Sequence, residues 1–202
     1  MNMPTLKIDG LTELLKTISP EIIRKAANRT LNELAALAKT QSSTAIRAIY
    51  NVKKARLDKE ITIQKTSLAA DTPRVTLTVT GTRIGLQNFS ARASAKKGVS
   101  VLVKKNSGRK TVKKAFMARG LNFGGEDGGV DLIFKRTGLP KRLMSKGRYA
   151  GTKILREPIK KLNMTDPVGM MTTIGLAAID KLMDERSEDI FTRNLDWYGR
   201  DL

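Results

Sequence analysis

The sequence contains no cysteine and no histidine among its 202 residues. The lack of cysteine excludes a disulfide framework and a thiolate nucleophile, and the lack of both residues excludes the usual structural zinc site. Without histidine the commonest general base is missing, so Ser-His-Asp and Cys-His catalysis are excluded as well. Aromatic residues are scarce, at 4%, which predicts an aliphatic core.

Long apolar runs are also missing. No segment approaches the roughly 18 apolar residues of a membrane span, and residues 1–10 lack the basic and then apolar pattern of a signal peptide. We therefore expect a soluble protein that is made in a cytoplasm and has no membrane partner. The formal net charge of +19 favours an acidic partner.

The positive charge is concentrated in one part of the chain. Residues 1–165 hold 34 basic and 11 acidic side chains, whereas residues 166–202 hold 4 basic and 8 acidic ones. No carboxylate occurs between Asp71 and Glu126, an interval with twelve Lys and Arg residues. Because like charges repel one another in a compact fold, we interpret this stretch as a surface that nucleic acid or an acidic protein covers. A merely solvated basic face is the alternative.

Helical signals occur at both ends of the sequence. Ser19-Pro20-Glu21 is typical of a helix start, and apolar residues then recur at helical spacing as far as Tyr50 without an intervening Gly or Pro. A helix of about 30 residues would be about 45 Å long, so we expect it to pack along a sheet or a neighbouring subunit. A short helix is predicted over 52–59, and a C-terminal helix is predicted after Asp166-Pro167.

The middle of the chain has the alternating pattern of strands. Strands are predicted to start at Ile61, to cover 75–79 and 99–103, to return over 111–118 after a turn at Asn106-Ser107-Gly108, and to cover 130–134. Residues 90–98 are interpreted as a mobile basic loop. Residues 138–165 have little periodicity and contain Pro158, which predicts an extended basic arm, with a disordered loop as the alternative.

These patterns predict an α+β fold. In it, a long N-terminal helix and a C-terminal helix pack on a small antiparallel sheet of about four or five strands, from which an extended basic arm projects. We expect a single domain over 1–202, which comprises a helical part (1–60), the sheet with its basic hairpin (61–137), the arm (138–165) and an acidic C-terminal helix and tail (166–202).

The sequence offers little catalytic chemistry. The glycine-rich segment 124–129 does not fit a phosphate-binding loop, since it lacks the Lys of that motif and contains Glu126 and Asp127. Two carboxylates on a glycine-rich tip are also poorly placed to hold catalytic geometry. We therefore predict no enzyme activity, no catalytic or metal-binding residues and no cofactor.

Contact with a polyanion needs only clustered Lys and Arg. The candidate residues for contact with nucleic acid or an acidic partner are Arg92, Lys96, Lys97, Lys104, Lys105, Arg109, Lys110, Lys113 and Lys114. No aromatic residue lies between Phe89 and Phe116 to stack on bases, so contact with DNA should be non-specific and depend steeply on salt. The candidate subunit-contact residues of the arm are Lys141, Arg142, Lys146, Arg148 and Tyr149.

Seven short pieces, taken in order, make the sequence similar to a known family. They are Ala27-Asn28-Arg29-Thr30, Val52-Lys53-Lys54, Val99-Ser100-Val101-Leu102-Val103, Lys114-Ala115-Phe116-Met117-Ala118, Ile133-Phe134-Lys135-Arg136-Thr137-Gly138 with Leu139-Pro140, and Pro158-Ile159. Through their order and spacing the chain resembles the phage minor tail protein Z and tail-completion family. The glycine-rich segment 124–129 is longer than that pattern implies, and the acidic stretch after Asp180 is an addition to it.

The resemblance implies a virion structural protein without enzyme activity. Such a subunit would lie in a homo-oligomeric ring, expected to be a hexamer, at the head-proximal end of the tail. There it would contact adjacent tail and head-connector proteins, help to join head and tail, and hold the end of the genome by non-specific contact with DNA. The alternative is a cellular, ribosome- or chromatin-associated protein that binds nucleic acid non-specifically.

Overall fold

The computed structural model describes residues 19–67, 72–81, 83–119, 131–143, 150–164 and 166–200. The chain divides into two compact units. The first contains Met1–Arg47, Lys54–Gly81 and Pro167–Leu202, and the second contains Ala48–Lys53 and Thr82–Asp166. Each unit is described by itself, and the single domain expected over 1–202 stays a prediction.

The predicted N-terminal helix is confirmed as α2 (Pro20–Ile49), which runs for 30 residues. At its start the carbonyl oxygen of Ser19 accepts hydrogen bonds from the backbone N–H groups of Ile22 and Ile23, at 3.0 and 3.2 Å. Pro20 is the first helical residue, a position at which its fixed φ is favourable and its missing N–H is not needed. The short helix expected next is α3 (Lys54–Glu60).

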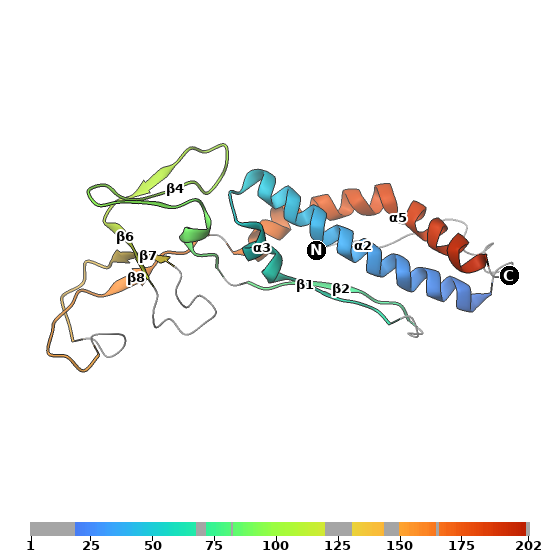
Figure 1. Ribbon diagram of the computed structural model, residues 1–202, viewed down its shortest axis with the longest axis horizontal. Coiled ribbons are helices and arrows are strands. Elements are labelled where there is room, and N and C mark those ends of the chain that lie inside the picture. The colour runs from blue at the N-terminus through green and yellow to red at the C-terminus, as the bar shows by residue number, and fades with distance from the viewer. Residues whose placement is uncertain are drawn as a thin grey trace. The chain divides into compact units, whose positions relative to one another are not determined.

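The core of the first unit lies between α2 and the C-terminal helix α5 (Leu176–Gly199). Ile23 and Ala26 of α2 form a buried apolar cluster with Phe191 and Leu195 of α5. The two helices run side by side in the first unit (Figure 1). The long helix therefore packs on another helix.

The C-terminal helix begins where the sequence predicts. A short helix, α4 (Pro167–Met170), continues through a π-helical turn, η2 (Met171–Gly175), into α5. Of the apolar residues near the end of α5, Phe191 and Leu195 are buried, whereas the Trp197 side chain is 56% exposed. The guanidinium of Arg29 lies 5.3 Å from the centre of the Trp197 ring.

Of the helices in the described residues, none is both long enough and apolar enough to cross a membrane.

A hairpin of β1 (Ile61–Gln64) and β2 (Thr76–Val79) completes the first unit. Its attachment to α2 is polar, because Thr66 donates to the buried Oδ1 of Asn28 at 2.7 Å and exchanges two 3.0 Å hydrogen bonds with Asn32. At the other end of the hairpin, the buried carboxylate of Glu60 is held by the Arg56 guanidinium at 2.5 Å.

The second unit contains two antiparallel three-stranded sheets. One has the order β3-β4-β5, and the other has the order β6-β7-β8. Their bounds are β3 (Arg92–Ser94), β4 (Gly98–Val101), β5 (Lys110–Val112), β6 (Ala115–Arg119), β7 (Asp131–Arg136) and β8 (Ile159–Lys161). The short 3-10 helix η1 (Leu86–Asn88) precedes them. The core side chains of this unit are mostly aliphatic, as expected, and the largest fully buried ones include Ile84, Phe89, Leu132 and Ile133.

The mixed helix and strand composition is confirmed, but the single sheet of about four or five strands is not. The described strands form three small sheets. One reason lies at Lys114, whose φ of +61° turns the chain and splits the predicted return strand over 111–118 into β5 and β6. The mobile loop predicted over 90–98 is also wrong, because this segment forms β3 and a tight turn into β4.

Candidate contact surfaces

The nine predicted contact residues gather around one small sheet. We call residues 92–114, which comprise β3, β4, β5 and the turns between them, the basic sheet. All nine Lys and Arg side chains belong to it, and all nine are exposed. The sequence placed these residues in one acid-free stretch, and the fold brings them onto one compact element.

Four lysines lie together at one end of the basic sheet. Lys96 and Lys97 form the turn between β3 and β4, and Lys113 and Lys114 form the turn after β5. The two turns are adjacent, because a Cβ at Gly98 would lie 3.3 Å from both the Cα of Lys113 and the backbone nitrogen of Lys114. Four ammonium groups on short turns can therefore face a single anionic partner.

The other end of the basic sheet carries Lys104, Lys105 and Arg109 on the loop that joins β4 to β5, and Lys110 at the start of β5. β4 spans four residues, so about 10 Å separates the two ends. Arg109 folds back onto the sheet, where its Nη2 donates to the carbonyl oxygen of Ser90 at 2.5 Å and to that of Ser100 at 3.1 Å. This guanidinium stiffens the loop as well as contributing charge.

Backbone pairing with the residues after α2 also fixes this loop. The N–H of Asn51 donates to the carbonyl oxygen of Val103 at 2.8 Å, and the N–H of Lys105 donates to that of Ile49 at 2.9 Å. The ammonium of Lys104 lies 5.6 Å from the centre of the Tyr50 ring, a cation–π geometry. The basic sheet is thus a rigid platform whose exposed lysines can meet phosphates or carboxylates.

The predicted arm is an out-and-back excursion between β7 and β8. The arm predicted over 138–165 is shorter than expected, because residues 159–161 form strand β8. We call residues 138–158 the arm, of which 138–143 and 150–158 are described. Its two sides pair at the base, where the Thr137 N–H donates to the Pro158 carbonyl oxygen at 3.0 Å, and further out, where Arg142 and Arg156 exchange two 3.0 Å backbone hydrogen bonds. Backbone hydrogen bonds therefore join the two described sides of the arm.

Of the five predicted arm contacts, Lys141 and Arg142 are exposed on this element. Lys146, Arg148 and Tyr149 lie outside the described residues, as does the glycine-rich segment 124–129.

The sequence prediction missed the aliphatic side chains of the arm. Leu139, Leu143, Ile154 and Leu155 are 56%, 59%, 49% and 56% exposed. Each lies within two residues of a Lys or Arg in the sequence. This mixture of aliphatic and basic residues was the sequence signal that could have indicated exposed aliphatic side chains. A group of exposed aliphatic side chains on one element is typical of a protein interaction site.

An acidic surface covers the exposed side of α5. Its carboxylates are exposed, and they are Asp180, Asp184, Glu185, Glu188, Asp189 and Asp196. Ion pairs compensate part of the charge of this region, between Lys181 and Glu185 at 3.7 Å and between Arg193 of α5 and Glu33 of α2 at 2.5 Å. Within the predicted acidic C-terminal helix and tail (166–202), α5 is a helix whose exposed face carries these carboxylates.

Beside this surface, a groove of about 270 Å³ runs between α2 and α5. Its apolar lining comes from Leu37 of α2 and from Ala178 and Leu182 of α5. Gln41, Lys181, Glu185 and Arg186 supply its polar lining. We call this the α2–α5 groove. The groove can make apolar contacts with a partner, and charged side chains surround those contacts.

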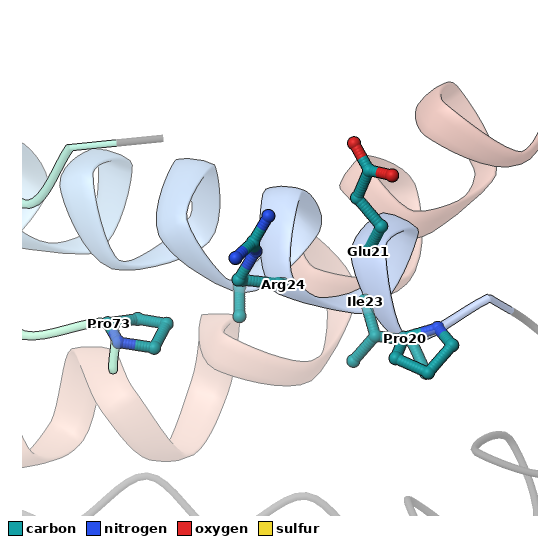
Figure 2. A pocket seen from close by; sticks show the side chains of 6 residues that line it. Pro20, Glu21, Ile23, Arg24 and Pro73 are labelled. Carbon is teal, nitrogen blue, oxygen red and sulfur yellow. The ribbon is translucent and has the colours of Figure 1, made fainter. Parts of the chain in front are cut away.

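A larger hollow, of about 580 Å³, lies at the start of α2. Its lining includes Pro73, from the segment before β2, and Pro20, Ile23 and Arg24 of the first helical turns. Figure 2 shows Pro73 and Pro20 on opposite sides of Arg24. Glu21 on its rim receives a 2.7 Å hydrogen bond from Lys25, and this bond and the nearby positive charge lower the pKa of the Glu21 carboxyl. The lining contains one carboxylate, which is already paired with this lysine.

The described residues contain no group of three or more Asp and Glu side chains arranged to hold a metal ion. The surfaces available for contact with a partner are therefore the basic sheet, the arm, the acidic face of α5 and the groove beside it.

Comparison with known family models, with curated proteins and with solved structures finds no match for this chain.

Proposed function

We propose that this chain is a structural subunit of a phage virion, a tail-completion or neck protein at the head-proximal end of the tail. Six copies form a ring that contacts adjacent tail and head-connector proteins, helps to join head and tail, and holds the end of the genome. The proposal rests on the sequence resemblance and on the surfaces that the described residues offer for contact.

The observation that carries the proposal is the basic sheet. Nine cationic side chains, without one carboxylate among residues 92–114, surround a platform of three short strands. Repulsion among these charges opposes the compact state unless an anionic surface lies against them. In a ring at the neck, that surface is the DNA in the channel or an acidic face of the neighbouring ring.

The test reverses charges on the basic sheet. The variant changes Lys104, Lys105, Lys110, Lys113 and Lys114 to Glu, and it replaces the wild-type chain during phage production. Because a polyanion is held by such contacts, we expect a loss of genome retention, of particle assembly, or of both. The measurements are the yield of complete particles and the amount of DNA that they keep.

The control reverses Lys65 and Arg74 to Glu, two exposed cations outside the basic sheet. We expect this control to assemble and to retain DNA normally. Wild-type behaviour of the five-residue variant in both measurements would remove the proposal. Negative-stain microscopy of the purified chain supplies a second test, since rings or binding to tail tubes are expected.

The alternative function is non-specific binding of nucleic acid by a cellular protein, which the same exposed cations favour. If six or more of them contact phosphates, affinity for duplex DNA should fall about 10³-fold or more between about 50 and 200 mM salt. A monomer that binds any duplex in this way, without rings or binding to tail tubes, would support the alternative.

A further inference from the structure

The exposed aliphatic side chains of the arm need a partner that DNA does not provide. Leu139, Leu143, Ile154 and Leu155 are each about half exposed. Phosphates attract cations, whereas contacts between aliphatic side chains require another apolar surface. The partner of the arm is therefore a protein surface.

The charge of the arm indicates what kind of protein surface it contacts. Lys141, Arg142, Lys153 and Arg156 are exposed beside the aliphatic side chains. The one carboxylate among the described residues of the arm, Glu157, accepts a 2.7 Å hydrogen bond from the Gly138 N–H through its Oε1. The complementary surface is consequently acidic at its rim and apolar at its floor.

The chain itself carries such a surface. The α2–α5 groove has Leu37, Ala178 and Leu182 in its apolar lining, and its polar lining contains Glu185 together with Lys181 and Arg186. Asp189 follows Glu185 after one helical turn on the same side of α5, and Asp189 is exposed. The exposed charges of α5 are six carboxylates against Lys181, Arg186 and Arg193, so the surface around the groove has a net negative charge. An apolar floor and an acidic surround, the two requirements of the arm, thus occur on one face of the first unit.

We propose that the arm of one copy docks in the α2–α5 groove of a second copy. Leucine and isoleucine side chains of the arm enter the groove, while Lys141 and Arg142 meet Glu185 and Asp189. The surfaces on the two sides of the contact differ, so it is heterologous and repeats from copy to copy until a ring closes. The contact rests on the proposed function in one respect, since it would be the repeating interface of the proposed ring.

The first experiment is a charge swap read by sedimentation velocity. The arm variant carries Lys141→Glu and Arg142→Glu, and the groove variant carries Glu185→Lys and Asp189→Lys. Each alone should weaken self-association of the full chain about tenfold or more, because like charges then face each other across the contact. An equimolar mixture of the two variants should associate again, because the reversed charges of one meet the reversed charges of the other.

The control carries Asp180→Lys and Asp184→Lys. These residues are on α5 as well, and the change in net charge equals that of the groove variant, but neither residue lines the groove. This control should associate like the wild type. Circular dichroism of every variant checks that the helices still form.

The second experiment uses the lack of native cysteine. A chain with Leu143→Cys is mixed with a chain with Gln41→Cys, whose position lines the groove. We expect a disulfide-linked dimer of the two different chains under mild oxidation. A chain with Ala36→Cys, an exposed position of α2 outside the groove lining, should cross-link to the arm far less.

Three results would overturn the docking contact. The first is a wild-type chain that stays monomeric at every concentration, and the second is a mixture of swapped variants that does not associate again. The third comes from one chain that carries both Leu143→Cys and Gln41→Cys, if its disulfide forms only within the chain and never between two copies. These results would leave the proposed function standing if reversal of the basic sheet still abolishes genome retention. The opposite outcome is also distinguishable. If the mixture of swapped variants associates again, but each variant alone assembles phage particles normally, the contact is supported and the virion function is overturned.

Discussion

Truncation of Phe191 tests the packing of α5 on α2. The side chain of Phe191 is 2% exposed and lies in the cluster with Ile23, Ala26 and Leu195. A buried Phe removes about 150–250 Å² from water, which at about 25 cal/mol per Å² corresponds to an upper limit of about 4–6 kcal/mol. Measured Phe→Ala changes in cores cost about 3–5 kcal/mol.

We therefore expect Phe191→Ala to lower the free energy of unfolding by about 3–5 kcal/mol, a large part of the roughly 5–15 kcal/mol of a typical domain. The assay is urea unfolding followed by the fluorescence of Trp197, the single tryptophan of the chain. Because Trp197 lies on α5 next to Arg29 of α2, its signal reports on this helix pair.

The control for this experiment is Thr192→Ala, an exposed neighbour on α5, which should change stability by no more than about 0.5 kcal/mol. A loss below about 1 kcal/mol for Phe191→Ala, typical of an average substitution, would refute the packing of Phe191 between the helices. An equal loss in both variants would refute it as well, since burial would then have no influence.

Two other substitutions test the hydrogen bonding and turn geometry of the fold. Gly98→Ala should cost about 1–3 kcal/mol and increase amide exchange in β3 and β4, because φ is +97° and the new Cβ would lie 2.4 Å from a carbonyl oxygen of β5. Gly108→Ala, with φ of +70° and open space around it, should cost less; equal costs would exclude the steric explanation. Asn194→Leu should cost about 1–3 kcal/mol by leaving the buried Thr30 hydroxyl without its 3.1 Å partner. The double variant with Thr30→Val should recover part of that loss in a urea titration, and strict additivity would contradict the hydrogen bond.

The helices could be predicted because their signals are local. A start at Ser19-Pro20 and an unbroken apolar stripe define α2, and Asp166-Pro167 marks the region where α4 begins. The strands could be located for the same reason, since alternation is readable over four residues. Their grouping into sheets could not be predicted, because the positive φ of Lys114 has no signature in a lysine.

Some of the candidate surfaces could be predicted from the sequence and others could not. The nine cations of the basic sheet were predicted by composition, since an acid-free stretch of chain becomes a basic surface wherever it folds. The aliphatic side chains of the arm were missed, because the same Leu and Ile residues would be core residues if another element covered them. The α2–α5 groove is formed by Leu37 and Leu182, which are 145 residues apart in a sequence that gives no sign of their contact.

The amino-acid sequence by itself determined the sign and location of the charge, the exclusion of thiol and imidazole chemistry, and the long helices at both ends. These properties depend on residue type or on neighbours within a few positions, so no contact between distant residues is needed to read them. Only the tertiary structure decided that α2 packs on α5, that the described strands separate into three small sheets, and that Leu139, Leu143, Ile154 and Leu155 of the arm are exposed. These properties depend on which distant segments cover one another, and burial is fixed only when the whole chain has folded.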